Sequence, residues 1–304
     1  MQTDLVIVSE YCQKCHIDPS FIILLEEGGL IDINITDGER YLFSSQLRDL
    51  EQYTRMYYDL YINIEGIEAI MDAAEEEHCP VILTVGQGAI KAGQLEHLAD
   101  LVKRIAREST VPVVLHLDHG ISYEQTVQCL RLGFTSVMYD GSHDSLADNI
   151  RESQTVVRSA HAVGVSVECE LGAISGVEDG ISHKNVNLVD VDEVREITSK
   201  VDCDALAVGI GNAHGMYQGT PHFDFDRLQA CQKLSPPPLV LHGGSGTPDD
   251  MIRQAIKLGI RKINVATELR MAFMEGLEST VGQRDFYQMY RTAKENMTAL
   301  ARHK

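Results

Sequence analysis

The chain has 304 residues, a length that suits one large α/β domain or a domain with an appendage. Its hydrophobic fraction of 44% and charged fraction of 23% are those of soluble globular proteins. The formal net charge of −19 argues against nucleic-acid binding through the bulk surface, although it allows a locally positive site for a phosphorylated substrate. The longest apolar stretch, residues 21–25, is too short to cross a membrane, and the amino terminus lacks the basic and apolar regions of a signal peptide, so we expect a cytoplasmic protein.

The first seventy residues predict a small segment of mixed structure. Asp37-Gly38 stands between two β-prone runs, which strongly favours a tight hairpin turn. The predicted elements are a strand at 5–8, helices at 9–15 and 19–27, hairpin strands at 31–36 and 40–43, and a long helical stretch from 44 to about 77.

One cysteine pattern in this segment has more than one interpretation. The seven cysteines of the chain are odd in number and scattered, which in a cytosolic protein indicates reduced thiols. The run Cys12-Gln13-Lys14-Cys15-His16 matches the covalent haem-attachment pattern, and its first four residues match a redox pair. Without an export signal or a following βαβ unit, we interpret these cysteines as part of a small helix.

From residue 80 onward, short β-rich runs alternate with amphipathic helical stretches. The expected strands are 81–85, 113–117, 136–139, 165–170, 205–208, 239–241 and 262–265. The expected helices include 95–108, 123–132, 146–163, 190–199 and 248–258. This alternation predicts an α/β fold with a parallel sheet and right-handed crossovers. The natural closure is a (β/α)8 TIM barrel, of which only seven strands can be counted.

Three histidines each follow one of these strands and precede a glycine, namely His119, His214 and His242. Because the carboxyl ends of parallel strands meet at one mouth, we expect the imidazoles to converge and to hold one catalytic Zn²⁺ with an open fourth position. The alternative is three separate histidines that cap loops. His116 lies two residues before Asp118 on the same strand, and we interpret it as a support residue rather than a ligand.

Residues from about 72 to 302 resemble the class II, zinc-dependent fructose- or tagatose-bisphosphate aldolases. Six motifs carry the resemblance in order, and they stand as HLDHG (116–120), SVMYDGSH (136–143), SVECELGAISGVEDG (166–180), ALAVGIGNAHGMY (205–217), LVLHGGSG (239–246) and KINVATEL (262–269). The ending Ala266-Thr267-Glu268 leans toward the tagatose-type branch. The resemblance implies a lyase of carbohydrate metabolism and glycolysis that cleaves a ketose phosphate to dihydroxyacetone phosphate and an aldehyde. No residue separates the epimers.

The resemblance also assigns roles to acidic residues. Asp118 is the expected general base on the C4 hydroxyl, with a supporting role beside His119 as the alternative. Glu178, on a glycine-hinged loop from Gly172 to Gly180, is the expected acid that exchanges the proton of bound dihydroxyacetone phosphate, with a solvated surface glutamate as the alternative. Asp140 and Glu170 match residues that hold a second divalent or monovalent cation in some members; simple hydrogen bonding is the alternative.

A phosphate site is expected on the loops that follow the last two strands. Such loops commonly cradle phosphate with backbone N–H groups, which glycines allow to approach closely, and hydroxyl groups add donors. The residues expected there are Gly215, Gly243, Gly244, Ser245, Asn264, Ala266 and Thr267.

Residues 5–70 resemble the winged-helix segment of MerR-type regulators, on the runs EEGGLI (26–31) and DLYINIEGIEAI (59–70). Residues 1–70 hold four basic and thirteen acidic residues, a net charge of −9, and Lys14 is the only Lys or Arg before Arg40. So few cations cannot neutralise several phosphates, which disfavours DNA. The chaperone-modulator branch is the better match, and we expect a protein partner; a fusion without a function of its own is the alternative.

The two resemblances meet within one helix and predict two domains, 1–70 and 71–304. Family members begin the barrel with an Ala-Phe-Asn strand, and Asp59-Leu60 stand where Phe-Asn is expected. The barrel therefore lacks its first strand, and an unclosed barrel leaves two unpaired edges. We expect a homo-oligomeric aldolase. The competing hypothesis is a catalytically silent fusion that acts as a protein-interaction or regulatory module.

Overall fold

The computed structural model describes the chain except for residues 1–4, 16–21, 23–25, 27–30, 37, 48–49, 51–63, 179–180, 184–187, 218 and 281–284. It divides into two compact units, one of residues 1–73 with 270–304 and one of residues 74–269. No helix among the described residues is both long and apolar enough to cross a membrane.

The amino-terminal segment forms a small antiparallel sheet. Its strands are β1 (Leu5–Ile7), β2 (Ile33–Thr36) and β3 (Glu39–Phe43), in the order β1-β3-β2. Helix α1 (Val8–Cys15) follows β1, and a 3-10 turn, η1 (Ser44–Gln46), follows β3. The hairpin between β2 and β3 confirms the one predicted around Asp37-Gly38, where Gly38 has a φ of 81°. The described residues thus show an antiparallel sheet with one helix rather than the predicted winged helix.

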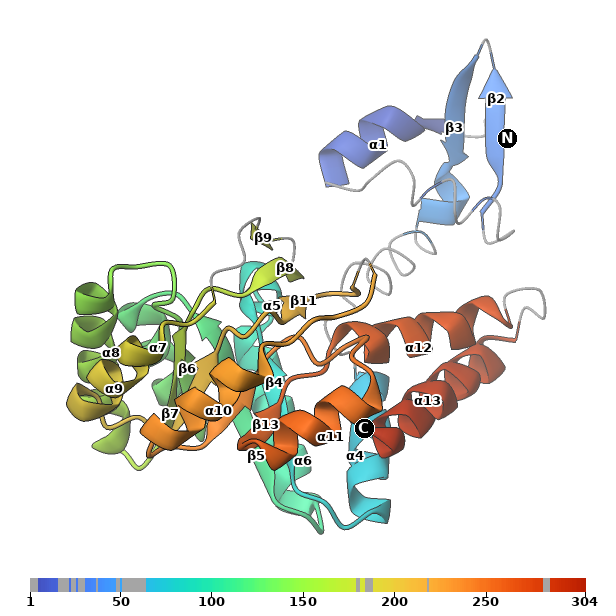
Figure 1. Cartoon of the computed structure of the whole chain (residues 1–304). Coiled ribbons are helices and arrows are strands. Elements are labelled where there is room, and N and C mark those ends of the chain that lie inside the picture. The colour runs from blue at the N-terminus through green and yellow to red at the C-terminus, as the bar shows by residue number, and fades with distance from the viewer. Residues whose placement is uncertain are drawn as a thin grey trace. The chain divides into compact units, whose positions relative to one another are not determined.

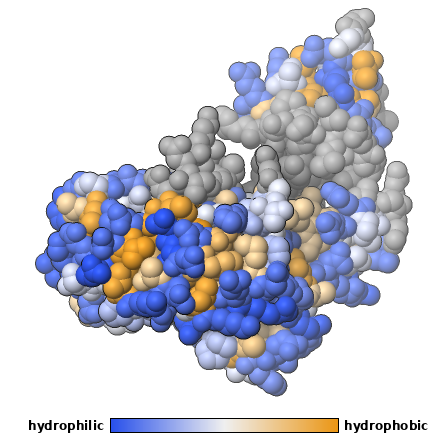
Figure 2. Space-filling model, in the orientation of Figure 1, coloured by the Kyte–Doolittle hydropathy of each residue, from blue (hydrophilic) through white to orange (hydrophobic). Residues whose placement is uncertain are grey.

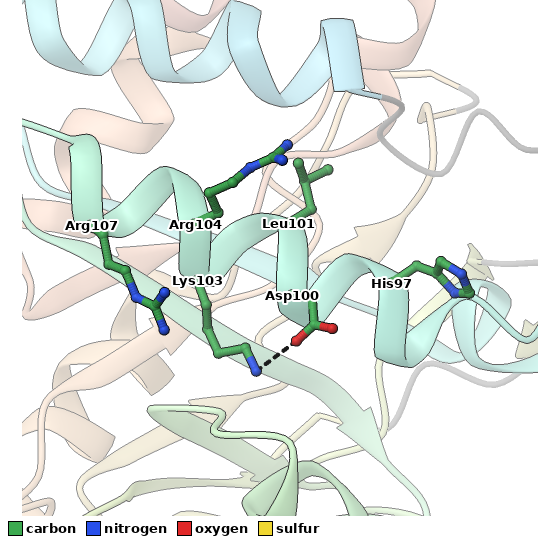
Figure 3. Close-up of a pocket in the computed structure, with 6 residues that line it drawn as sticks. All are labelled: His97, Asp100, Leu101, Lys103, Arg104 and Arg107. Atoms are coloured by element: carbon green, nitrogen blue, oxygen red, sulfur yellow. Dashed lines mark ion pairs between the residues drawn. The ribbon is translucent and has the colours of Figure 1, made fainter.

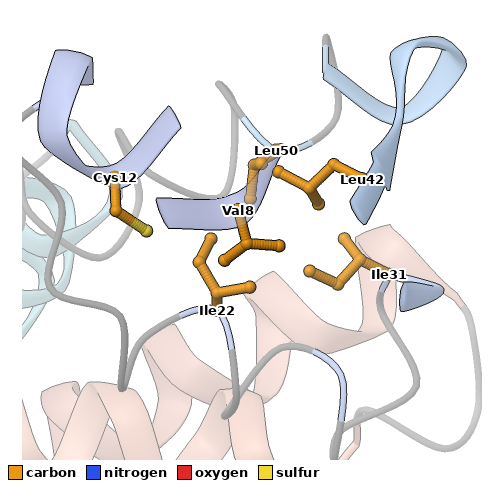
Figure 4. Close-up of a cluster of buried hydrophobic side chains, with 6 residues drawn as sticks. All are labelled: Val8, Cys12, Ile22, Ile31, Leu42 and Leu50. Atoms are coloured by element: carbon orange, nitrogen blue, oxygen red, sulfur yellow. The ribbon is translucent and has the colours of Figure 1, made fainter. Parts of the chain in front are cut away.

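A small apolar cluster packs this segment together. Leu42 of β3 is fully buried, and the apolar faces of α1 and the sheet gather around it. Figure 4 shows the six side chains of the cluster converging, Val8, Cys12, Ile22, Ile31, Leu42 and Leu50. Cys12 is a member, so the cysteine pattern contains a core position on the predicted small helix. The predicted helix at 19–27 falls largely outside the described residues.

The rest of this unit is helical. Helix α4 (Ile64–Glu76) carries Glu68 and Asp72, whose carboxylates lie 3.1 and 2.9 Å from the Lys294 Nζ of α13 (Phe286–His303). Helix α12 (Thr267–Glu278) precedes α13 along the chain. A Cβ on its Gly276 would lie 2.4 Å from the Cα of Ala293, so the two backbones approach closely.

The second unit is built on a parallel sheet of seven strands (Figure 1). Its order is β13-β12-β10-β7-β6-β5-β4, so each strand follows its sheet neighbour in sequence, as right-handed crossovers produce. The strands are β4 (Val81–Val85), β5 (Val113–Gly120), β6 (Ser136–Tyr139), β7 (Ser166–Leu171), β10 (Ala205–Val208), β12 (Leu239–Leu241) and β13 (Ile260–Ile263). Four of the seven have the predicted bounds, whereas β5 ends three residues later, β7 begins and ends one residue later, and β13 begins and ends two residues earlier.

Helices connect these strands and cover the sheet. They are α5 (Gln87–Lys91), α6 (Leu95–Glu108), α7 (Tyr123–Arg131), α8 (Leu146–His161), α9 (Val191–Lys200), α10 (Phe225–Leu234) and α11 (Asp249–Lys257). Four begin at a Ser or Asp side chain that accepts a first-turn N–H, as helix N-termini require. The visible outer surface of this unit is mostly hydrophilic with apolar patches between (Figure 2).

A second, smaller sheet is formed by segments that follow β7 and β10 in the sequence. Strand β8 (Ser175–Glu178) pairs with β9 (Ile181–His183) in an antiparallel hairpin and with β11 (Ala213–His214) in parallel. The predicted glycine-hinged loop therefore has regular structure, and it is paired with the strand that carries His214.

Candidate active site

A change of backbone direction at the end of β5 positions the first site residues. The pairing of β5 with β6 shifts register between Leu117 and Gly120, and His119 has a φ of 47°, a left-handed conformation that costs a non-glycine residue energy. A Cβ on Gly120 would lie 2.3 Å from the Met138 carbonyl oxygen, so only glycine fits there. On a regular strand the neighbours Asp118 and His119 would point to opposite faces, and this turn removes that restriction.

Hydrogen bonds from a buried glutamine hold this strained turn. Gln87, at the start of α5, is 4% exposed and donates from Nε2 to the His119 carbonyl at 2.7 Å. Gln125 accepts from the same Nε2 at 2.8 Å and donates back to Gln87 at 3.0 Å. The paired amides thereby fix the backbone that carries His119.

The three predicted histidines lie together. Ligand nitrogens of His119, His214 and His242 are all within 4.8 Å of one another, and their ring centroids are 4.6 to 5.9 Å apart. They come from the carboxyl ends of β5 and β12 and from β11. This is the arrangement expected of a metal site rather than of separate loop caps.

Carboxylates fix the tautomers of two of these rings. His119 Nδ1 lies 2.7 Å from Asp140 Oδ2, and His242 Nε2 lies 2.8 Å from Glu168 Oε1. The remaining nitrogens, His119 Nε2 and His242 Nδ1, then face each other at 2.9 Å. Two lone pairs at that distance repel, so a proton or a cation must lie between them.

The charges around His119 favour that cation. Burial opposes the imidazolium, but the hydrogen bond to Asp140 and the charges of Asp118 and Glu170 raise the pKa of His119 well above its ordinary value. Burial likewise acts to raise the pKa of Asp140, yet its bond to His119 holds it well below its usual range. The site therefore favours a positive charge between the two rings, which a bound metal ion would supply.

The donor set fits a metal ion. It offers three imidazole nitrogens, and two of the rings bond a carboxylate on the other side, which is the usual outer support of metal-bound histidine. His119, Asp140 and Glu170 form a second close group. Burial and the charge of Asp140 raise the pKa of Glu170 well above its usual range, and its Oε2 has no hydrogen-bond partner among the described residues.

Asp118 lies beside the cluster and is 6% exposed. Asn264 Nδ2 donates to its Oδ1 at 3.1 Å and also lies 3.4 Å from His242 Nδ1. Asn264, predicted on a phosphate loop, thus also contacts the predicted base and a predicted ligand.

The predicted glycine loops approach one another closely. Gly243 has a φ of 68°, and a Cβ there would lie 2.1 Å from the Ala213 carbonyl oxygen, next to His214. Ser245 Oγ accepts from the N–H of Ala266 at 3.2 Å and of Glu268 at 3.3 Å, on either side of Thr267 at the start of α12. Because the hydroxyl accepts these bonds, its own hydrogen stays available to donate.

Gly215 and Glu178 were also predicted as site residues, and they lie on or directly after strands of the smaller sheet. Gly215, with a φ of 86°, directly follows β11. The backbone of Glu178 lies at the end of β8, and its side chain falls outside the described residues.

Three polar residues beneath the cluster were not predicted from the sequence, namely Glu168, Lys262 and Gln87. Glu168 is 2% exposed and contacts His242, while Lys262 and Gln87 each bond a group of the site. Two of them could have been found from the alternation of side chains along a strand, because residues two positions apart share a face. Glu168 lies two residues before Glu170, and Lys262 lies two residues before Asn264. His116, predicted as a support, is 1% exposed, bonds Ser136 Oγ at 2.8 Å, and has its pKa lowered to about 4, chiefly by burial and then by Lys262.

A surface hollow of about 490 Å³ lies along α6, away from this cluster (Figure 3). Its described lining is His97, Asp100, Leu101, Lys103, Arg104 and Arg107, and Lys103 pairs with Asp100 at 2.8 Å. None of the predicted site residues is among them.

Three histidines gathered beside the carboxyl ends of a parallel sheet, two of them supported by carboxylates, form a candidate metal site on an α/β fold. The chain belongs to the class II fructose-bisphosphate aldolase family, whose model, "Fructose-bisphosphate aldolase class-II", matches residues 59–304. It is therefore an enzyme of an aldolase family of lyases, and the hypothesis of a catalytically silent module is not favoured. The model "MerR HTH family regulatory protein" matches residues 6–77, which confirms the second resemblance, and the two matches share residues 59–77.

Individual proteins similar to this chain are also aldolases by name. A fructose-bisphosphate aldolase of Thermus caldophilus is 43% identical over 73% of this chain and 80% of its own. A 6-phospho-5-dehydro-2-deoxy-D-gluconate aldolase of Halalkalibacterium halodurans is 41% identical over 74% and 79%. The crystal structure of the YdjI aldolase from Escherichia coli K12 superposes with a TM-score of 0.71 at 34% identity, covering 79% of this chain and 86% of that one.

Proposed function

We propose that the chain is a Zn²⁺-dependent aldolase that cleaves a ketose 1,6-bisphosphate of the fructose or tagatose type to dihydroxyacetone phosphate and an aldehyde. The observation that carries this proposal is the convergence of His119, His214 and His242 within 4.8 Å, directly beside the buried carboxylate of Asp118. Zinc held by the three imidazoles would supply a Lewis acid for the negative charge that develops on the ketone oxygen.

The residues of the chain then divide the proton chemistry. Asp118 takes the proton of the C4 hydroxyl, C4 becomes the aldehyde carbon, and the electron pair of the broken C3–C4 bond stays with the ketone fragment. Glu178 returns a proton to that C3 carbon. Asn264 donates to Asp118 Oδ1 at 3.1 Å, which keeps one oxygen of the base oriented. In the opposite direction Asp118 protonates the aldehyde oxygen.

Substrate phosphate would lie on the glycine loops. The close approach of Gly243 to Ala213 brings the two loops together, and the hydroxyl hydrogen of Ser245 is available as a donor. Backbone N–H groups of Gly215, Gly244 and the Ala266-Thr267 run complete the proposed cradle. Asp140 and Glu170 would hold a second cation when one binds.

The test is zinc content by mass spectrometry together with a coupled assay for dihydroxyacetone phosphate. Chelation should abolish turnover and added zinc should restore it, and the double variant His119→Ala/His214→Ala should bind no zinc and show no activity. The exposed His97 gives a matched control, His97→Ala, that should behave as the unchanged protein. Cleavage by the chelated protein or by the double variant would refute the proposal.

For the whole chain we propose the domains 1–70 and 71–304, a cytoplasmic location, a role in glycolysis and assembly into a homo-oligomer. The seven-stranded sheet would be a class II aldolase barrel whose first strand is missing, with β4 and β13 as its edges. For residues 1–70 we propose a protein partner rather than DNA, supported by their MerR match and their excess of acidic residues. Pull-down with the full chain and with one lacking residues 1–50 tests this.

A further inference from the structure

A lysine lies beneath the candidate site. Lys262 of β13 has a side chain only 14% exposed. Its Nζ is 2.9 Å from Glu168 Oε2 and 2.8 Å from Asn264 Oδ1. An ammonium group so enclosed needs partners for its charge, and these two partners each contact a different part of the site.

The first contact determines which nitrogen of His242 carries a proton. Lys262 Nζ lies 2.9 Å from Glu168 Oε2 and donates to it, so this carboxylate is the anion of an ion pair. An ionised carboxylate only accepts hydrogen bonds, so His242 Nε2, at 2.8 Å, must be its donor. The lone pair of the neutral ring then lies on Nδ1, the nitrogen that faces His119.

The second contact determines which way the Asn264 amide points. Lysine only donates, so it selects the amide oxygen, and the amide NH2 is left to face Asp118 Oδ1 at 3.1 Å. Turned the other way, the amide would present its oxygen to a carboxylate and its NH2 to an ammonium, which are two repulsive contacts.

We propose that Lys262 is a positioning residue for both halves of the site. Through Glu168 it sets the tautomer of His242 that leaves Nδ1 for the metal, and through Asn264 it directs an N–H donor at Asp118. This assignment rests on the proposed function, since it takes His242 as a ligand and Asp118 as the base. Lys262 hydrogen-bonds to Glu168 and Asn264 and acts on His242 and Asp118 through these two side chains.

The competing explanation is that Lys262 only neutralises a buried carboxylate. Two variants separate the explanations. Lys262→Met keeps the length of the side chain but leaves Glu168 unpaired, which can impair folding. Lys262→Met/Glu168→Gln removes both charges, so no charge is left buried without a partner. In this double variant nothing dictates the tautomer of His242 or the direction of the Asn264 amide.

The experiment uses the full chain labelled with ¹⁵N-histidine. In the unchanged protein, metal-free, we expect His242 to carry its proton on Nε2 alone, and in the double variant we expect both nitrogens to share it. Zinc affinity, from competition with a chromophoric chelator, should fall about 10- to 100-fold in the double variant. In the coupled assay kcat should fall by a similar factor, with a smaller change in KM. Lys257→Met, at an exposed lysine of α11, should change none of these.

A double variant with unchanged zinc affinity and a single Nε2–H tautomer would overturn the proposal and leave Lys262 as a neutralising group. The same holds if the unchanged protein has a mixed tautomer. The tautomer and affinity measurements need no turnover. Loss of the tautomer in a protein without aldolase activity would therefore support the assignment while refuting the proposed function.

Discussion

The amino-terminal segment and the parallel α/β unit use buried residues in opposite ways. The six-residue cluster around Leu42 is apolar throughout. Beneath the histidines of the α/β unit, by contrast, charged and polar groups are almost fully buried, including Glu168 at 2% and Glu170 at 1% exposure. Such groups are costly to bury unless each is paired, so their pairing must be specified in detail. The buried residues of the first region therefore serve stability alone, whereas the buried residues of the second also form the candidate site.

The largest expected effect is on catalysis in the α/β unit. Asp118→Asn keeps the shape of the side chain but removes the proposed base, so kcat should fall by about 10²- to 10⁴-fold. The exposed Asp202 supplies the control Asp202→Asn, which should leave kcat unchanged. The coupled assay at saturating substrate checks this, and zinc content should be the same in both. A loss below tenfold would return Asp118 to a supporting role.

The amino-terminal segment should instead respond in stability. Leu42→Ala removes a fully buried side chain from the small cluster and should destabilise the segment by about 2–5 kcal/mol. Hydrogen exchange should then speed up for the amides of β1 and β3, while those of β5 and β7 keep their protection. Ile35→Ala, on the same sheet but 64% exposed, is the matched control. Equal loss of protection in both regions would show that the two unfold as one.

Removing the metal should destabilise the α/β unit and leave the amino-terminal segment unchanged, which is the opposite of the effect expected for Leu42→Ala. Ligand at about 100 times its dissociation constant stabilises the native state by about 2.7 kcal/mol, so chelation should lower the thermal stability of the α/β unit by that order. Exchange should quicken at β5, β11 and β12, whose ends carry the three histidines, and the amino-terminal sheet should not change. Scanning calorimetry and hydrogen exchange with and without chelator test this. An unchanged α/β unit would count against a resident metal.

Features set by local apolar patterns could be predicted from the sequence, whereas features that depend on contacts between distant residues could not. The alternation of apolar strands and helices predicted all seven parallel strands, and glycine-flanked histidines predicted which side chains gather. The turn at His119 was not predictable, because its left-handed conformation depends on contacts with Gln87 and Met138, which are distant in sequence. The three strands of the second, smaller sheet, β8, β9 and β11, were not predicted, because each has only two to four residues.

The buried polar partners escaped for a different reason. Glu168 and Lys262 lie in strands whose other residues are largely apolar, and periodicity gives their face but not their partners. Only the fold brings Lys262 to Glu168, ninety-four positions earlier in the chain. The winged helix was wrongly expected because a family resemblance was taken to fix the local structure.

A moderate effect is expected where the α/β unit holds its strained turn. Gln87→Ala leaves the His119 carbonyl without its 2.7 Å donor and should cost about 1–3 kcal/mol of stability. Zinc affinity should fall as well, by about tenfold, since the backbone of a ligand loses its support. Denaturant unfolding and chelator competition measure the two effects. Gln254→Ala, at an exposed position of α11, is the control, and equal affinities would mean that the turn holds without Gln87.

The smallest effect should come from a surface pair in the helical part of the first unit. Lys294 lies 2.9 Å from Asp72 and 3.1 Å from Glu68. Both carboxylates are about half exposed and the lysine side chain is 30% exposed, so solvent screens the attraction and Lys294→Met should cost less than about 1 kcal/mol. Burial is the largest single influence and acts to lower the pKa of Lys294, but its bonds to Asp72 and Glu68 together raise it. The contribution is therefore complete at neutral pH and is lost only as pH rises through that raised pKa. Urea unfolding at pH 7, beside the control Lys233→Met, should show a difference that shrinks at high salt; a cost above 2 kcal/mol would mean that charge pairing, and not only apolar burial, stabilises this unit.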